Sequence, residues 1–180
     1  MDSPSATTHR PFGISSVGLT VFIGGPIQHL EADSLLARTF EAFVRNLYIQ
    51  FLSSGHRVYS AHIEEDFGRD SAQFHSPSIA QRDFKWMSDA DVFLPVLPEL
   101  DGKILRTDGT HVELGWATAM RKPIALTTFL PLTAACSQLV RGLRCLTKMT
   151  LIDYELAAAN PASVVRVAEN LYADLANLET

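Results

Sequence analysis

The chain alternates between short runs of apolar residues and longer segments in which apolar residues recur at helical spacing. The short runs predict strands at 19–23, 57–60, 91–97, 123–128 and 149–153. The longer segments predict helices at about 36–51, 76–88, 110–120 and from 161 towards the end of the chain, with partial helix within 130–147. This alternation predicts an α/β fold, a flavodoxin-like or Rossmann-like parallel sheet of about five strands with helices on both faces.

Prolines and glycines refine these boundaries. Gly55 closes the first long helix, and Ser76 and Pro77 predict a helix start with serine as the N-cap and proline at the first helical position. Asn160 caps the last helix. Pro95 interrupts a strand, which predicts a sheet edge or a bulge at that position.

The first residues differ in composition from the rest. Residues 1–16 are rich in Ser, Thr and Pro and contain no apolar segment typical of a signal peptide, so we expect a flexible N-terminal tail. Residues 17–180 are long enough for a single domain. No apolar run is long enough to span a bilayer, and we expect a cytoplasmic protein without membrane contact.

Composition narrows the classes of ligand. Hydrophobic residues make up 47% of the chain, enough for a sizeable core, and the net charge is −5. Proteins that bind nucleic acid through its phosphates usually carry a basic surplus, so a nucleic acid polymer is not expected as a partner. A single small phosphorylated ligand remains compatible. Cys136 and Cys145 are interpreted as reduced thiols, and the histidines show no metal-ligand spacing, so we expect no metal.

The predicted topology indicates where a ligand would bind. In parallel sheets, ligands bind at the carboxyl ends of the strands, which selects residues 24–30, 60–70 and 98–113. Gly24 and Gly25 would let a phosphate approach backbone N–H groups closely, although a tight turn alone also needs glycine. The Rossmann glycine pattern and the phosphate-binding lysine motif are absent.

Glu113 has two interpretations. Thr110 and Glu113 match a capping box, in which the carboxylate would return a hydrogen bond to the backbone at the helix start. The same position in a first helical turn would favour the ionised carboxylate, which suits attack on the anomeric carbon of a sugar.

Asp83 shares one predicted helix face with three large apolar residues, where an unpaired charge is costly. Either a base such as Arg82 pairs with it, or it lines a polar pocket. The apolar residues of that face are Ile79, Trp86 and Met87.

Three segments resemble a known family. VFIGGPI at 21–27, RDFKWMSDADVFLPVL at 82–97 and GTHVELGWATAMRKP at 109–123 resemble the nucleoside 2-deoxyribosyltransferase superfamily. The branch that they resemble most is that of the nucleoside 5′-monophosphate N-glycosidases, which includes the CMP and hydroxymethyl-CMP N-glycosidases of nucleoside-antibiotic pathways. The resemblance implies a flavodoxin-like fold, no metal or organic cofactor, and a homodimer whose subunits share active sites.

The resemblance also implies roles for individual residues. Glu113 matches the family's nucleophile, and Asp83 matches its second catalytic carboxylate. Thr107 lies where relatives carry a phosphate-binding serine, and the loop that precedes it, residues 98–108, is longer here than in the deoxynucleotide hydrolases. Ser137 resembles a serine that, in relatives, reaches into the active site of the neighbouring subunit. Phe22 replaces a tyrosine near the sugar, which favours a ribonucleotide. The other expected substrate-binding residues are Gly24, Gly25, Ile27, Gln28, Gly109 and His111.

We therefore expect hydrolysis of the N-glycosidic bond of a nucleoside 5′-monophosphate, such as CMP or a related pyrimidine ribonucleotide, to free base and ribose 5-phosphate. Transfer of the sugar to a second base is one alternative, and cleavage of the nicotinamide glycosidic bond is another. The alternative that is not an enzyme is a module that binds a nucleotide without cleaving it.

Overall fold

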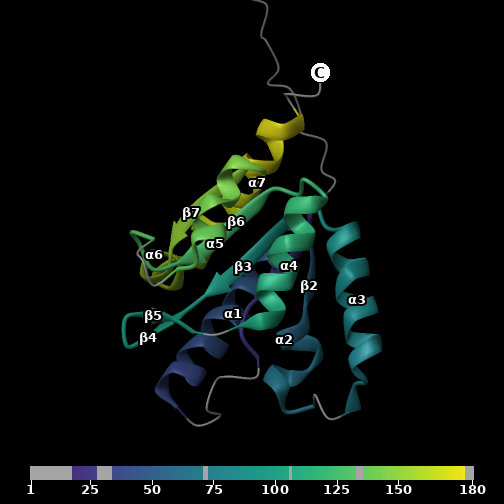
Figure 1. Cartoon of the computed structure of the whole chain (residues 1–180), viewed down its shortest axis with the longest axis vertical. Helices are drawn as coiled ribbons and strands as arrows, with labels where there is room; N and C mark the ends of the chain where they lie inside the picture. The colour runs from purple at the N-terminus through teal and green to yellow at the C-terminus, as the bar shows by residue number, and fades with distance from the viewer. Residues whose placement is uncertain (1–17, 28–33, 71–72, 106, 133–135, 177–180) are drawn as a thin grey trace, which may run out of the picture.

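The predicted strands form one parallel sheet in the computed structural model, which describes residues 18–27, 34–70, 73–105, 107–132 and 136–176 (Figure 1). The sheet has five strands in the order β2-β1-β3-β6-β7. The strands are β1 (Thr20–Gly24), β2 (Arg57–Ser60), β3 (Val92–Leu97), β6 (Ile124–Thr128) and β7 (Met149–Asp153). The expected tail at 1–16 lies outside the described residues.

Helices connect the strands. The long helices are α1 (Leu35–Ser53), α3 (Ser76–Asp89), α4 (Asp108–Ala119) and α7 (Pro161–Ala176). Sequence periodicity missed the short elements, which are α2 (Ala61–Glu64), η1 (Asp66–Gly68), the hairpin of β4 (Glu99–Leu100) and β5 (Lys103–Ile104), and α6 (Tyr154–Ala159). The partly helical segment expected after residue 130 contains α5 (Gln138–Gly142) and η3 (Leu143–Cys145).

Side chains that alternate along the strands divide the core into two layers. On one face, Val21 and Ile23 pack with residues of α1 and α7. On the other face, Phe22 packs with residues of α3, α4 and α5. Helices therefore cover both faces of the sheet, as predicted (Figure 1).

Pro95 does not mark a sheet edge, because β3 is the central strand. It does not mark a bulge either. Phe93 pairs with Ile124 and Val96 with Thr127, so no residue is inserted in β3 relative to β6. The prediction was wrong because a central strand can accommodate a proline here. Pro95 lacks an N–H group, but it lies between the residues of β3 that pair with Ile124 and Thr127 of β6, and towards β1 it pairs with Gly24.

The start of α3 also differs from the prediction. The helix begins at Ser76 with His75 as the N-cap, and Pro77 is therefore the second helical residue. Proline is tolerated there because the first N–H groups of a helix have no intrahelical acceptor.

The strand order places a topological switch point between β1 and β3. The chain crosses from β1 to β2 on one side of the sheet, and β3 lies on the other side of β1. The connections therefore diverge at the carboxyl ends of β1 and β3, and ligands bind at this position in folds of this kind.

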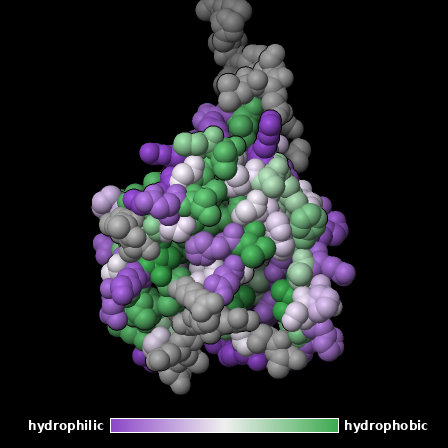
Figure 2. Space-filling view, viewed as in Figure 1, coloured by the Kyte–Doolittle hydropathy of each residue, from purple (hydrophilic) through white to green (hydrophobic). Residues whose placement is uncertain are grey.

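The surface of the face with α3, α4 and α5 mixes hydrophilic and hydrophobic residues (Figure 2). Three apolar side chains on these helices are exposed by about half or more, namely Phe84, Val112 and Leu139. No helix within the described ranges is both long and apolar enough to cross a membrane.

Candidate active site

A cavity of about 450 Å³ lies at the carboxyl edge of the sheet, where β1, α2, α3 and α4 meet. All three segments that topology selected contribute to its wall. The first turns of α3 complete it. The rule on strand ends had not selected this helix, although the family resemblance had selected its Asp83. The lining residues are Gly24, Gly25, Pro26, Ile27, Ala61, His62, Glu65, Phe74, Ser76, Ile79, Asp83, Thr107, Asp108, Gly109, Thr110 and Glu113.

Glu113 projects from the second turn of α4 and is 8% exposed. Its Oε2 atom is buried and has no hydrogen-bond partner among the described residues. A methyl group on Gly24 would lie 2.5 Å from this atom. Glycine at the end of β1 therefore gives the carboxyl group the room it occupies.

The position of Glu113 excludes the capping box. Thr107 is the N-cap of α4, so Thr110 and Glu113 are the third and sixth helical residues. A carboxylate at the sixth position cannot return a hydrogen bond to the cap. The N-terminal field of the helix also fades beyond the first turn, so the expected preference for the ionised form has little support from the dipole.

Burial instead favours the protonated form of Glu113. It raises the pKa of Glu113 to about 8, and the negative charge of Asp83 acts in the same direction. The Arg82 guanidinium opposes the shift without cancelling it. Glu113 therefore retains its proton at neutral pH in the ligand-free protein.

Asp83 and Arg82 form part of a buried charge cluster with Glu65. Arg82 Nε donates to Asp83 Oδ1 at 2.8 Å, and Arg82 Nη2 donates to Glu65 Oε1 at 2.6 Å. Burial raises the pKa of Asp83, and the hydrogen bond from Arg82 opposes this. Asp83 is thus paired with Arg82 and also lines the cavity, so both alternatives from the sequence analysis are correct.

Aromatic rings fix the Arg82 guanidinium. Its central carbon lies 4.5 Å from the ring centroid of Trp86 and 5.5 Å from that of Phe74. Trp86 in turn stacks on Tyr59 with a centroid separation of 5.3 Å. The Nη1 atom is buried without a partner in the part of the chain that the structure describes. Arg82 therefore holds two carboxylates from a rigid position.

His62 holds the glycine turn in place. Its ring is buried, Nε2 donates to the carbonyl oxygen of Pro26 at 3.2 Å, and Nδ1 lies 3.5 Å from Ser60 Oγ. Burial lowers the pKa of His62 to about 4, so the ring is neutral at physiological pH. Sequence analysis gave His62 no role, because the buried environment that defines it comes from packing.

The start of α4 offers neutral donors to the cavity. Thr107 forms no side-chain capping bond to the helix and donates to Thr110 Oγ1 at 2.7 Å. Among the described residues that line the cavity there is no lysine or arginine. An anion in this cavity would therefore be bound by hydroxyl and backbone N–H groups rather than by a cationic side chain.

Three expected substrate-binding residues that the structure describes, Phe22, His111 and Ser137, are not part of this cavity wall. Phe22 is fully buried with its ring centroid 5.9 Å from that of Trp86, so its side chain is not exposed to the cavity, and its place near the sugar stays a prediction. His111 Nδ1 donates to the carbonyl oxygen of Thr107, and Ser137 caps α5. Both line a smaller neighbouring pocket. Gln28 lies outside the described residues.

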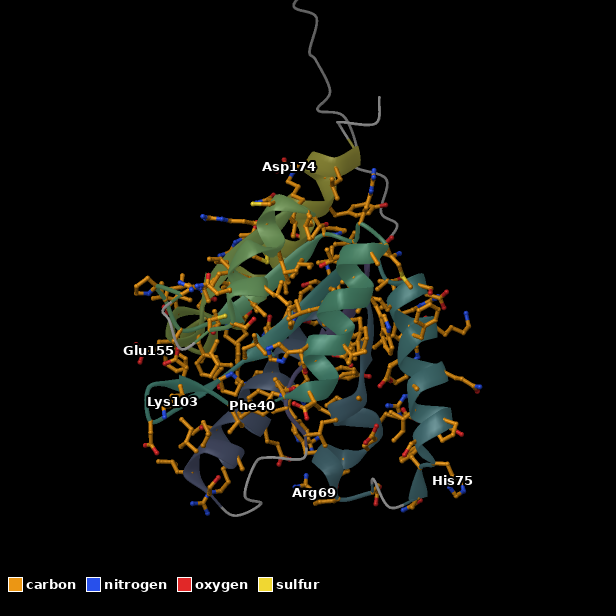
Figure 3. All side chains as sticks on the ribbon, viewed as in Figure 1. Phe40, Arg69, His75, Lys103, Glu155 and Asp174 are labelled. Carbon is orange, nitrogen blue, oxygen red and sulfur yellow. The ribbon has the colours of Figure 1, made fainter. Side chains whose placement is uncertain are left out.

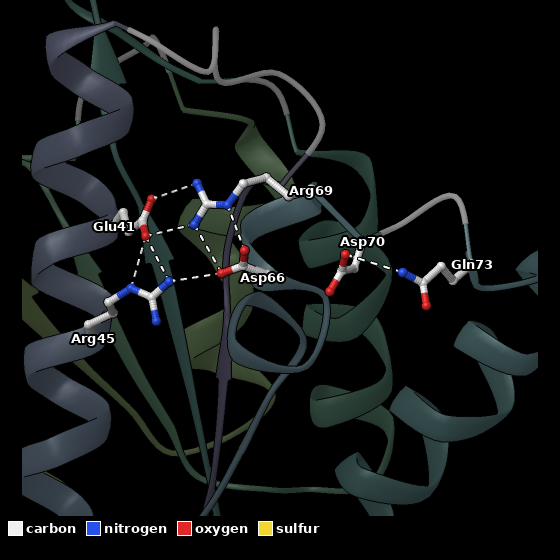
Figure 4. Close-up of polar contacts among 6 residues, drawn as sticks. All are labelled: Glu41, Arg45, Asp66, Arg69, Asp70 and Gln73. Carbon is white, nitrogen blue, oxygen red and sulfur yellow. Dashed lines mark hydrogen bonds and ion pairs between the residues drawn. The ribbon is translucent and has the colours of Figure 1, made fainter.

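An ion-pair network supports the outer wall beside the glycine turn (Figure 4). Arg45 and Arg69 both contact Glu41 of α1 and Asp66 of η1, at 2.7–3.0 Å. Asp66 and Phe67 have positive φ angles, and a methyl group on Gly68 would lie 2.9 Å from Ile27. The network thus holds a left-handed segment against the glycine turn.

The side chains around this edge come from distant parts of the chain. Phe40, Arg69 and His75 all lie at the end of the molecule where the strands terminate (Figure 3).

No group of three or more His, Cys, Asp or Glu residues within the described ranges is arranged to hold a metal ion.

Comparison with known proteins identifies a family and similar solved structures. A family model described as nucleoside 2-deoxyribosyltransferase matches residues 21–141, which is more than half of the chain. The solution structure of BlsM is 28% identical, with a TM-score of 0.62, and the alignment covers 84% of this chain and 92% of BlsM. The CMP N-glycosidase BcmB of Clostridium botulinum is 21% identical with a TM-score of 0.53, over 75% of this chain and 88% of that chain, a likeness of fold. A comparison with curated proteins gave no match.

Proposed function

The chain belongs to the nucleoside 2-deoxyribosyltransferase family, and on this basis we propose that it hydrolyses the N-glycosidic bond of a nucleoside 5′-monophosphate. The products are the free base and ribose 5-phosphate, and CMP or a related pyrimidine ribonucleotide is the proposed substrate. The observation that supports this most strongly is that Glu113 and Asp83, 30 residues apart in the chain, line one cavity at the carboxyl edge of the sheet.

Glu113 is the proposed nucleophile. One carboxyl oxygen of Glu113 forms a bond to C1′ while the bond between C1′ and the base nitrogen breaks, and its electrons leave with the base. Water then attacks C1′ of the ribosyl-enzyme and releases the sugar. Two displacements at C1′ give net retention of configuration.

The acid pair supplies the proton that the departing base needs. Between them, Glu113 and Asp83 hold one proton at neutral pH, because burial keeps Glu113 protonated and Arg82 pairs with the Asp83 carboxylate. As Glu113 attacks, its proton passes to Asp83 and from there to the base. In the second step, water loses a proton to the same pair, which restores the starting state.

The phosphate is proposed to lie at the start of α4 and the glycine turn. Thr107 and Thr110 place hydroxyl groups there, and the first N–H groups of α4 have no side-chain cap. Gly24 and Gly25 present backbone at the opposite wall, where side chains would collide with Glu113 or Phe40. This placement leaves the sugar between phosphate and acids.

Replacement of Glu113 by glutamine tests the nucleophile. We expect Glu113→Gln to reduce release of free base from CMP by at least about 1000-fold, since the amide cannot form the ester intermediate. Glu155→Gln changes an exposed glutamate on α6 and should leave the rate unchanged. A Glu113→Gln protein that kept more than about a tenth of the wild-type rate would exclude this role.

Transfer of the sugar to a second base is the alternative that the family match favours. It uses the same ribosyl-enzyme and differs only in whether water or a base attacks C1′. Addition of a second free base distinguishes the two: a hydrolase continues to release ribose 5-phosphate, whereas a transferase forms a new nucleotide.

A further inference from the structure

A second cavity, of about 900 Å³, lies on the sheet face that carries α5, at the edge strand β7. It shares no lining residue with the candidate active site. Its wall comes from β7, from α5 and η3, and from residues 130–132. Strand β7 and helix α5 lie on the opposite side of the molecule from α3 (Figure 1). No step of the proposed reaction uses this cavity.

Part of the wall of the second cavity is apolar. Leu132, Met149 and Leu151 are half-buried and pack against the core on this face of the sheet. Leu130 lines the same cavity and is 40% exposed. An apolar group that covers these side chains would gain free energy, because it removes their surface from water.

Two arginines give the second cavity a positive charge. Arg141 of α5 and Arg144 of η3 line it, and neither forms an ion pair or a hydrogen bond within the described part of the chain. No aspartate or glutamate is among the described residues of its wall. By contrast, Arg45, Arg69 and Arg82 each pair with two carboxylates. The positive charge of the second cavity is therefore available to an anion.

Arg141 also has a buried donor that is not satisfied. Its Nε atom is buried and has no hydrogen-bond partner within the described ranges, and an unmet buried donor costs free energy. The Nε atom and one terminal nitrogen of a guanidinium donate in parallel to two oxygens of a carboxylate, sulfonate or phosphate group. Arg144 adds a second positive charge, and Gln138 adds an amide donor. The second cavity thus combines donors for an anion with an apolar surface.

We propose that the second cavity binds a small organic anion, in which a carboxylate, sulfonate or phosphate group is attached to an apolar ring or short chain. Its volume of about 900 Å³ and its apolar wall with a few polar groups are typical of small-molecule sites. Binding needs both parts of the ligand, because the arginines contact the charge and the leucines contact the apolar group. This inference does not depend on the proposed reaction at Glu113.

Cys145 reports whether the second cavity is occupied, because it lines the cavity and is an exposed free thiol. The experiment follows alkylation of Cys145 by iodoacetamide, an uncharged reagent, by mass spectrometry at neutral pH. The probes are naphthalenesulfonate, the uncharged naphthalenesulfonamide with the same ring, and inorganic sulfate. Naphthalenesulfonate at about ten times its dissociation constant should slow alkylation about tenfold, because the unoccupied fraction of the protein falls by that factor. The other two probes at the same concentration should change the rate less than about twofold.

Substitution of the arginines tests how the anion is bound. Arg144→Gln removes an exposed charge and should weaken protection by naphthalenesulfonate about tenfold, since hydrogen bonds to charged groups contribute on that scale. Arg141→Gln should weaken it at least as much. The matched control is Arg166→Gln, which removes an exposed arginine of α7 and should keep the wild-type affinity. Because Arg144 is exposed, its variant keeps the test decisive if Arg141→Gln does not fold.

Four outcomes would overturn the inference. The first is no protection of Cys145 by naphthalenesulfonate up to about 10 mM, which is weaker than a specific site of this size should bind. The second is equal protection by the sulfonamide, and the third is unchanged protection in Arg144→Gln. The fourth is protection that rises with protein concentration in the absence of any probe, because a second copy of the chain would then cover the cavity.

Discussion

Glu113 combines a titratable carboxyl group with almost complete burial, which is costly unless the group stays protonated. The sequence identified the residue, since Glu113 lies in a segment that resembles a family of glycosidic-bond enzymes. It did not predict the protonation state. That depends on Asp83, Arg82 and Gly24, which are distant in the chain and adjacent only in the fold.

The shared proton predicts a pH profile. Since the pKa of Glu113 is raised to about 8, the free protein loses the proton of the acid pair as pH rises through that value. The base then has no proton to leave with, and kcat/KM should fall above about pH 8. Steady-state rates of base release between pH 5 and 10 measure this, and a kcat/KM that rises through pH 8 to a plateau would contradict the proton role.

The same raised pKa predicts a stability effect. Below pH 4.5 the carboxyl group of Glu113 is protonated both folded and unfolded, and its titration costs nothing. Between 4.5 and about 8 only the unfolded chain releases the proton, so stability falls by about 1.4 kcal/mol per pH unit. Glu113→Gln removes this penalty.

We therefore expect the free energy of unfolding of Glu113→Gln to exceed that of wild type by about a few kcal/mol at pH 8, and to equal it near pH 4. Urea denaturation of both proteins at the two pH values measures the difference. An advantage of the same size at pH 4 and pH 8 would mean that packing, and not titration, causes it.

At the scale of elements, regular periodicity was enough for the strands and long helices and failed at short or irregular segments. Strand β2 and strand β7 have the predicted bounds. Helix α2 and η1 are too short to show a period, yet His62 lies in α2 and Glu65 lies between the two elements, and both residues line the cavity. Pro95 misled the prediction, because a single sequence does not show which N–H groups of a central strand lack a partner.

The end of β1 gives a prediction at this scale. In Gly24→Ala, the added methyl group would lie 2.5 Å from Glu113 Oε2 and 3.0 Å from the ring of Phe93. The Glu113 carboxyl group must move, and a displacement of about 1 Å at a reacting atom can lower kcat about 100-fold. Gly142→Ala is the control, since its methyl group meets no atom within 4 Å. Equal rates of base release for both variants would contradict the claim that Gly24 is needed to give the Glu113 carboxyl group its position.

For the whole molecule, the order of elements predicted an α/β fold, whereas the order of strands in the sheet had to come from the structure. The rule that ligands bind at carboxyl ends still selected three segments of the cavity wall. The rule missed the start of α3, because the residues that this helix adds to the cavity wall depend on how the helix packs against the sheet. A homodimer with shared sites stays a prediction, and the exposed Phe84, Val112 and Leu139 mark one face that could be tested for it.

The account as a whole depends on a covalent bond between the sugar and Glu113. Wild-type protein mixed with CMP should be quenched in acid during turnover, digested and analysed by mass spectrometry. We expect the peptide that contains Glu113 to gain the mass of ribose 5-phosphate less one water, and the gain to be absent in Glu113→Gln. An adduct on another residue, or base release by wild type with no adduct at any time, would contradict the account.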